Sequence, residues 1–279
     1  MEVIFDNVGF VYTDNATFIK PILNNINIQF KKNSINVVTG KSGSGKTTLI
    51  ELIDALQLPT KGNIKVGNRI IDQRKVKNIN NLRNKVGIVF QFPEEQFFSN
   101  TVEKEIEFGI KHLNKSVKDI KKHILDALIM VGLDETYLNK SPYLLSSGEK
   151  RKIAIASVLA FNPKLLILDE PTIGLDNESV NNIIKILKLL KNRYDKTIII
   201  VSKDTDFIHK IADYVVVLND GKLVLEGNKY EVFTSNVESY GIKKPKIIEF
   251  EQLAREKGIR LLYRDDINDL MKDVYRHVK

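Results

Sequence analysis

Cysteine is absent from the 279-residue sequence, and so are long apolar runs. Without cysteine the chain has no disulfide and no thiolate ligand for a metal. No apolar run approaches the roughly 18 residues of a membrane-spanning helix, and residues 1–6 lack the basic-then-apolar pattern of a secretory signal. The sequence therefore predicts a cytosolic chain, which leaves docking on a membrane protein open.

Concentrated positive charge is also absent, although Lys and Arg (43) outnumber Asp and Glu (35) and the formal net charge is +8. The basic residues are scattered, without the clusters and interleaved aromatics that nucleic-acid binding favours. We interpret the excess as a solvated surface and expect no nucleic-acid partner. Attraction to anionic lipid headgroups is the alternative interpretation.

Short apolar runs alternate with segments of helical spacing, which is typical of an α/β fold. Strands are predicted at residues 3–12, 22–30, 35–39, 64–66, 69–71, 86–90, 165–168, 197–202, 215–218 and 223–225. Helices are predicted at residues 46–56, 101–112, 116–131, 147–161, 177–193, 247–255 and 267–278. The region of about 92–163 is therefore a helical insertion, and a helical tail follows the last strand.

The glycine-rich stretch at residues 40–47, GKSGSGKT, fits all eight positions of a phosphate-binding loop between a strand and a helix. Its backbone N–H groups would surround the phosphates of ATP, and the helix dipole would add to their field. Lys46 would reach the β- and γ-phosphates, and Thr47 would ligate Mg²⁺. The predicted nucleotide-binding residues here are Gly40, Ser42, Gly43, Ser44, Gly45, Lys46, Thr47 and Thr48. A chance glycine turn is the alternative, which the flanking strand and helix disfavour.

Two adjacent carboxylates, Asp169 and Glu170, end the apolar run at residues 165–168. Asp169 suits a second Mg²⁺-holding role. Glu170 suits the general base that activates the attacking water. Alone, the pair reads as ordinary acids at a strand end, but the phosphate loop upstream favours the catalytic interpretation.

These motifs, in this order, resemble the ATPase subunits of ABC transporters over residues of about 1–235. The distinguishing stretch is the signature LSSGE at residues 145–149, which precedes Asp169, Glu170 and Asp176. The resemblance implies an α/β P-loop ABC ATPase with a RecA-like core, an antiparallel β subdomain and a helical subdomain at about 92–163. It also implies a short helical extension at residues 236–279 that helps pair two ATPases.

The resemblance further implies that two chains sandwich ATP, so that each site needs both. Tyr12 would stack on adenine. Gln91 would ligate Mg²⁺, sense the γ-phosphate and lean toward the membrane partner. The residues that would bind the nucleotide held by the opposite chain are Ser146, Ser147 and Gly148, and Asp176 is also expected to bind nucleotide. A plain helix cap is the alternative role of Ser146, and a strand-end tyrosine that of Tyr12.

A finer resemblance is to the energy-coupling factor transporters, carried by residues 91–98 (QFPEEQFF), 101–109, 141–142 and 150–156. It implies uptake of vitamins or metal ions and a peripheral place on the cytoplasmic face of the cell membrane. The implied partners are a second ATPase, an integral-membrane scaffold and small substrate-binding membrane subunits. A heterodimer is expected, with a homodimer as the alternative. Residues 18–21, with 141–143, favour the second of the two ATPase paralogues.

Three residues depart from the family pattern: Ser147 and Glu149 in the signature, and Lys203 where the family has a switch histidine. Neutral histidine donates and accepts hydrogen bonds, whereas lysine only donates. We therefore hypothesise that this chain's own ATP site hydrolyses slowly, with Lys203 holding the γ-phosphate as a point charge. A solvent-facing Lys203 with no catalytic role is the alternative. Gly148 is the retained glycine, expected to allow close backbone approach to phosphate.

Three other functions compete with a hydrolysing energy-coupling subunit. One is the ATPase of a conventional ABC importer or exporter. Another is a poorly hydrolysing regulatory subunit, which Lys203 and Glu149 favour and Lys46, Asp169 and Glu170 oppose. The last is a soluble ABC ATPase acting on DNA or ribosomes, but the chain has neither a coiled-coil insert nor two cassettes.

Overall fold

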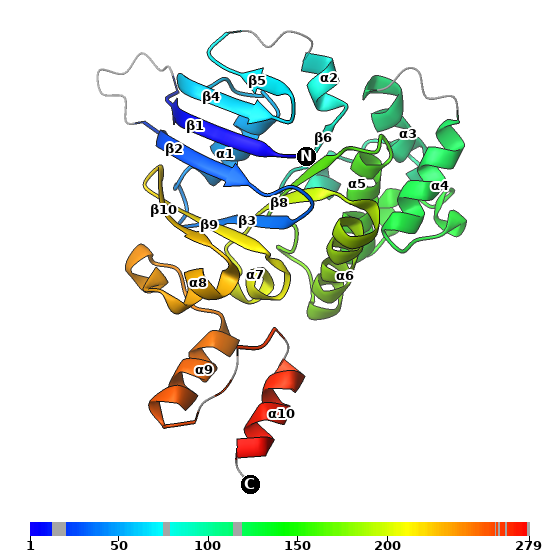
Figure 1. Ribbon diagram of the computed structural model, residues 1–279. Helices are drawn as coiled ribbons and strands as arrows, with labels where there is room; N and C mark the ends of the chain where they lie inside the picture. Colours follow the sequence, from blue (N-terminus) through cyan, green and yellow to red (C-terminus); the bar gives the residue numbers. More distant parts are fainter. Residues whose placement is uncertain are drawn as a thin grey trace.

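Two β-sheets, a group of helices beside them and a pair of C-terminal helices make up the structure, which is a computed structural model (Figure 1). It describes residues 1–12, 21–74, 79–113, 119–259, 261, 263–265 and 267–277. Within these residues no helix is long and apolar enough to cross a bilayer. The sequence features at residues 18–20 lie outside the described residues.

The smaller sheet is antiparallel, with the order β2(Leu23–Phe30), β1(Val3–Phe10), β4(Lys61–Val66) and β5(Arg69–Ile71). Its strands form because apolar side chains alternate with polar ones along them, so that one face is buried. In β2 the asparagines and glutamine point outward while the four apolar residues between them are buried. This is the expected antiparallel subdomain, although the first strand ends two residues earlier than predicted.

The larger sheet is mostly parallel and holds the core. Its order is β10(Lys222–Gly227), β9(Tyr214–Asn219), β3(Ile35–Thr39), β8(Thr197–Val201), β7(Leu165–Asp169) and β6(Val86–Val89), with only β10 antiparallel to its neighbour. Every residue of β3, β7 and β8 is buried. Both faces of this sheet are covered, which explains why these strands read as continuous apolar runs.

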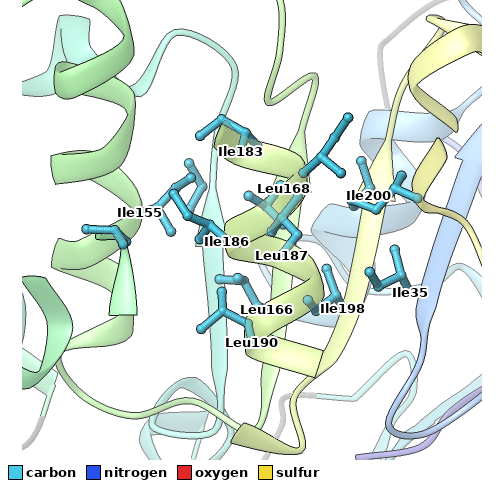
Figure 2. Packing of buried hydrophobic residues seen from close by; sticks show 14 of the residues in the cluster. Ile35, Ile155, Leu166, Leu168, Ile183, Ile186, Leu187, Leu190, Ile198 and Ile200 are labelled. Carbon is cyan, nitrogen blue, oxygen red and sulfur yellow. The ribbon is translucent and has the colours of Figure 1, made fainter. Parts of the chain in front are cut away.

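Alternate side chains of β7 enter two separate apolar clusters. Leu166 and Leu168 join the cluster on the face covered by α6(Asn177–Tyr194), whereas Leu165 and Ile167 join the cluster between the two sheets. Figure 2 shows the first cluster, with these labelled members: Ile35, Ile155, Leu166, Leu168, Ile183, Ile186, Leu187, Leu190, Ile198 and Ile200. The second cluster includes the apolar residues of α1(Lys46–Ile53). The strand ends that bear the phosphate loop and the carboxylates are thus fixed from both faces.

The helical insertion is built from α3(Val102–Leu113), α4(Ile120–Met130) and α5(Ser147–Leu159). Short 3₁₀ turns at η1(Pro93–Gln96), η2(Glu135–Tyr137) and η3(Pro142–Leu144) connect them. The predicted start of the second helix falls at residues 116–118, outside the described part of the chain. The described portion begins where the Asp119 side chain accepts a hydrogen bond from the Lys122 N–H.

The remaining helices are α2(Ile79–Arg83), α7(Thr205–Ile211), α8(Lys229–Thr234), η4(Val237–Tyr240), α9(Lys246–Glu256) and α10(Ile267–His277). We did not predict α2, α7 and α8, because five to seven residues are too few to establish a helical period. The first helix after the phosphate loop also ends earlier than predicted, at Ile53 rather than residue 56. In Figure 1, α9 and α10 lie at the opposite end of the molecule from the small sheet.

Candidate active site

The phosphate loop lies between β3 and α1, and its shape depends on glycine. Gly40 has φ +149°, and a Cβ atom there would lie 2.1 Å from the Leu218 carbonyl oxygen. Gly45 precedes α1 with φ +96°. Both positions therefore require glycine.

The Lys46 ammonium group lies inside this loop. Its Nζ donates to the carbonyl oxygens of Gly40 (2.8 Å) and Lys41 (2.6 Å) and to Ser44 Oγ (3.3 Å). Burial and the nearby Lys203 charge lower the pKa of Lys46 to about 8, against the opposing charges of Glu170 and Asp169. The loop thus holds a lysine whose charged form is disfavoured by burial, and the phosphates of a nucleotide would stabilise that form.

Thr47 and Asp169 face each other at the end of β7, with 3.3 Å between Thr47 Oγ1 and Asp169 Oδ2. Burial raises the pKa of Asp169. Gln91 lines the same cleft. Hydroxyl, carboxylate and amide oxygens are the hard donors that Mg²⁺ prefers, and Mg²⁺ commonly takes its other ligands from substrate phosphates and water. These residues therefore fit a Mg²⁺ ion that arrives with ATP; among the described residues no cluster of three or more His, Cys, Asp or Glu could hold a metal.

Glu170 has a left-handed backbone, with φ +47°. Its N–H donates to the Val201 carbonyl oxygen at 2.8 Å, which fixes the turn at the end of the strand. Burial raises the pKa of the Glu170 carboxyl, which brings it closer to that of an effective general base. Left-handed geometry is unfavourable for a residue with a Cβ and is concentrated at functional sites.

Lys203 connects this carboxylate to the phosphate loop. Its backbone N–H donates to Glu170 Oε2 at 3.4 Å, and its Nζ donates to Ser42 Oγ at 3.2 Å. The side chain is exposed but directed at the loop. The structure thus places Lys203 between the Glu170 carboxylate and the phosphate loop.

A cleft of about 320 Å³ brings most of the predicted residues together. Its lining is Tyr12, Ile22, Ser42, Gly43, Gly45, Lys46, Thr47, Thr48, Gln91, Asp169, Glu170, Val201 and Lys203. Tyr12 is 47% exposed, packs edge-on against Phe10 and lies 3.5 Å from the Thr48 hydroxyl. A half-exposed ring at the rim can stack on a base. Gly40 and Ser44 do not line the cleft; both accept hydrogen bonds from Lys46 Nζ within the loop.

The signature residues lie outside this cleft, at the start of α5. Ser146 caps the helix, and its Oγ accepts from the Glu149 N–H at 3.3 Å. Glu149 in turn accepts from the Ser146 N–H, the Ser146 hydroxyl and the Tyr137 hydroxyl. These bonds, with that from Tyr137 first, lower the pKa of Glu149 to about 2. Glu149 therefore completes a reciprocal cap with Ser146, as a glutamine at this position also could.

Gly148 has a packing role that the sequence did not indicate. A Cβ atom there would lie 2.4 Å from Ser179 Oγ and 3.1 Å from Ser179 Cβ, on the first turn of α6. Asp176 caps that same helix by accepting from the Ser179 N–H at 2.7 Å. Ser146, Ser147 and Asp176 thus form one exposed surface between two helix starts, away from the chain's own cleft, and Gly148 is buried beneath it.

Arg151 is a buried residue whose role sequence reasoning missed. Its guanidinium is 1% exposed and binds the Glu94 carboxylate through two bonds of 3.0 Å. It also donates to the carbonyl oxygens of Pro171 (2.5 Å) and Ile173 (3.3 Å). Such a fork joins the turn after Gln91 and the helix after the signature to the loop after Glu170. No signal in the sequence connects Arg151 with Glu94, 57 residues earlier.

Comparison with known proteins finds similar proteins among the ABC transporter ATP-binding proteins. The ABC transporter family model matches residues 23–173. The energy-coupling factor transporter ATP-binding protein EcfA2 of Clostridium perfringens is 42% identical over 264 residues, which cover 94% of this chain and 92% of the relative. The structure of cbiO1 from Clostridium perfringens, described as part of the ABC transporter complex cbiONQ, matches with a TM-score of 0.76 and 33% identity over 90% of this chain and 98% of that chain.

A dimeric ATP-binding cassette, MJ0796, in a post-hydrolysis state bound to ADP and Pi, matches with a TM-score of 0.72 and 28% identity. That match covers 81% of this chain and 98% of the cassette. The predicted fold class is confirmed, and so is the resemblance to the second of two paralogues.

Proposed function

The chain belongs to the energy-coupling factor transporter ATP-binding proteins of the ABC transporter family, and we propose that its cleft and its signature surface serve two different ATP molecules. It is the ATP-binding and ATP-hydrolysing subunit of such a transporter and works with a partner ATPase and membrane components. The observation that carries the proposal is that the phosphate loop and both carboxylates share one cleft, while the signature lies outside it. A second chain must therefore complete each site.

In the chain's own cleft, Lys46 and the loop N–H groups hold the β- and γ-phosphates, and Tyr12 stacks on adenine. Thr47, Asp169 and Gln91 hold Mg²⁺, which supplies charge neutralisation at the phosphates. Glu170 orients the attacking water and accepts its proton. Ser146, Ser147 and Gly148, with Asp176, contact the nucleotide in the partner's cleft, where the start of α5 favours a phosphate.

Slow hydrolysis in this chain's own cleft follows from the contacts of Lys203. Its ammonium has no lone pair, so it stabilises charge on the phosphate but accepts no hydrogen bond from the attacking water. Its bond to Ser42 also anchors the side chain to the loop. We therefore assign more of the hydrolysis to the partner ATPase's cleft.

The membrane scaffold would dock on an apolar groove of about 200 Å³ between η1, α3 and α5. Phe98 and Phe108 line it, with ring centroids 4.5 Å apart, and both are about half exposed. The groove adjoins the turn after Gln91, so a docked helix of the scaffold would respond to the nucleotide. Small membrane subunits would bring vitamins or metal ions to that scaffold, with this chain peripheral on the cytoplasmic face.

Pairing of the two ATPases would involve the extension at residues 236–279. Its two longer helices expose several large apolar side chains: Phe250, Leu253, Ile267, Met271 and Tyr275. Exposed apolar faces of this kind mark protein interfaces. We propose a heterodimer with a second ATPase, with residues 1–235 as the nucleotide-binding domain.

Co-purification from native membranes tests this assembly. The chain is tagged, membranes are extracted in mild detergent, and bound proteins are identified by mass spectrometry. We expect a second ATPase, a common integral-membrane scaffold and several small integral-membrane proteins. Recovery of ribosomes, DNA or soluble proteins alone would contradict the transport role.

A further inference from the structure

A cleft of about 680 Å³ opens at the edge of the large sheet opposite the phosphate loop. The phosphate loop and Glu170 follow the carboxyl ends of β3 and β7, whereas this cleft is lined mainly by residues that precede β1, β3, β6, β7 and β8 and by the β4–β5 hairpin. Five of its lining side chains are cationic: Lys65, Arg69, Lys85, Lys164 and Lys196. The only acidic side chains in the lining are Glu2 and Asp195.

Three of the lysines form a row across neighbouring parallel strands. Lys85, Lys164 and Lys196 each immediately precede a strand, β6, β7 and β8 in turn. The Lys164 N–H donates to the Lys85 carbonyl oxygen at 2.9 Å, and the N–H of the residue after Lys196 donates to the Lys164 carbonyl oxygen at 3.1 Å. Neighbouring strands are about 4.8 Å apart, and like charges at adjacent positions repel. The row therefore favours a bound anion.

The positive charges of this cleft are largely unneutralised. Within the described ranges, no hydrogen bond or ion pair is found for the side chains of Lys65, Arg69, Lys85 or Lys164. The fifth, Lys196, is 4% exposed and donates to Asn162 Oδ1 (2.5 Å) and the Pro163 carbonyl oxygen (2.6 Å).

Burial, with the nearby Lys164 charge, lowers the pKa of Lys196 to about 8. Of the two lining carboxylates, Glu2 is directed to Gln29, whose Nε2 donates to it at 2.8 Å, and Asp195 is exposed at the end of α6. Positive potential thus dominates the cleft.

The cleft also has an apolar part. Val66 and Leu82 are buried beneath it, and the ring of Tyr194 is half-buried at its side. Its volume falls within the roughly 300–1,000 Å³ of small-molecule sites, which combine an apolar lining with a few placed polar groups. We propose that this cleft binds a phosphorylated small molecule of nucleotide size, with its phosphates on the lysine row and its apolar ring against Tyr194, above the buried Val66 and Leu82.

The site is separate from the ATP cleft, and both would be occupied at once. Mg·ADP at saturating concentration therefore fills the ATP cleft during the test. The probes are flavin mononucleotide, an aromatic phosphate followed by its fluorescence, and inorganic tripolyphosphate, which carries phosphates alone. Both are titrated into the full chain.

Two charge-matched double variants make the test specific. Lys85→Ala with Lys164→Ala removes two members of the row, whereas Lys185→Ala with Lys188→Ala removes two exposed lysines from α6. Each lysine that is removed takes away a charge-assisted contact to phosphate, so we expect the row variant to weaken flavin mononucleotide binding by about tenfold. Tripolyphosphate should displace the flavin from the wild-type chain.

The control variant should bind flavin mononucleotide as the wild-type chain does. Equal loss of flavin mononucleotide affinity in both variants, or no loss in the row variant, would contradict binding at the lysine row. Binding of tripolyphosphate without any binding of flavin mononucleotide would contradict the proposal that the ligand has an apolar ring. Thermal unfolding of each variant, which reports whether it is folded, keeps these outcomes interpretable.

Discussion

The cleft and the signature surface, which we propose to serve two ATP molecules, differ in how fully the chain satisfies its own polar groups. In the cleft, Lys46 has a pKa lowered to about 8, and burial raises the pKa of both Asp169 and Glu170. At the signature, Ser146 and Glu149 complete a reciprocal cap, and the bonds lower the pKa of Glu149 to about 2.

This contrast separates the roles of the two surfaces. The cleft holds the charges of Lys46, Asp169 and Glu170 in unfavourable surroundings. Nucleotide phosphates would neutralise Lys46, and a Mg²⁺ ion that arrives with them would neutralise Asp169, so binding would stabilise the chain. The signature surface is already hydrogen-bonded and needs no rearrangement before it meets the partner's nucleotide. One surface therefore provides the chemistry, and the other provides a rigid complement to it.

A glutamate-to-glutamine substitution in each surface should give the largest difference in the rate of ATP hydrolysis. Glu170→Gln removes the general base and should slow ATP hydrolysis by about 10²–10⁴-fold, with nucleotide affinity retained. Glu149→Gln alters only the helix cap and should keep most of the turnover. Single-turnover hydrolysis in the assembled complex measures each variant in the cleft that its residue would serve, with the partner's own cleft inactivated for Glu170→Gln and this chain's own cleft inactivated for Glu149→Gln. Comparable losses in the two variants would remove the distinction.

Breaking the connection between the surfaces should cost folding stability. Arg151→Met leaves the Glu94 carboxylate without its buried partner, and such losses typically cost about 3–5 kcal/mol. Urea unfolding followed by circular dichroism measures the free energy of unfolding. Adding Glu94→Gln should recover part of the loss, and no recovery would show that the two side chains are not coupled.

Gly148→Ala tests the packing of the signature surface. The new methyl group would meet Ser179, and overpacking of this kind costs about 1–3 kcal/mol. Ser179→Ala removes the nearest atom and should restore part of the stability in the double variant. Ser147→Ala, at the exposed neighbouring position, is the control and should unfold like the wild-type chain; a loss there as large as that of Gly148→Ala would contradict the packing explanation.

Lys203→His restores hydrogen-bond acceptance in the cleft. We expect single-site turnover to rise on the order of tenfold, below the full effect of a general acid or base. The assembled complex, with the partner's own cleft inactivated, isolates this site. Unchanged turnover would show that Lys203 does not limit hydrolysis.

Proton uptake on nucleotide binding is the smallest expected signal. The pKa of Lys46 is about 8 in the free cleft against 10.5 for ordinary lysine, so near pH 9 the free group is mostly neutral. Phosphates raise this pKa, so binding takes up a proton, and affinity falls as the pH rises above about 8. Calorimetry in two buffers of different ionisation enthalpy measures the uptake. Lys196→Met should retain it, and its absence from the wild-type chain would contradict the assignment.

The residues predicted from sequence were those whose motifs are local. The phosphate loop and the carboxylates after β7 occupy short stretches with fixed geometry, so spacing alone placed them. The reason for Gly148 was not predictable, because it depends on Ser179 of another helix. From sequence, Glu149 was interpreted as favouring a poorly hydrolysing subunit. Its hydrogen bonds to Tyr137 and Ser146 are seen only in the three-dimensional structure.

Strands of the large sheet were recognised because complete burial makes them continuous apolar runs. The shorter helices α2, α7 and α8 gave no periodic signal, since tertiary contacts rather than sequence period hold them. The signature was recognised by resemblance, which also implied that it would face the nucleotide of the opposite chain; the structure adds its position outside the chain's own cleft.

The guanidinium of Arg151 has a mechanical consequence. It belongs to α5 of the helical insertion, yet it is bonded to the turn after Gln91 and to the carbonyl oxygens that follow Glu170. A rigid-body rotation of the insertion would therefore shift the backbone next to Glu170. The orientation of this insertion, which the membrane partner would touch, thus becomes a determinant of when the water beside Glu170 is aligned for attack.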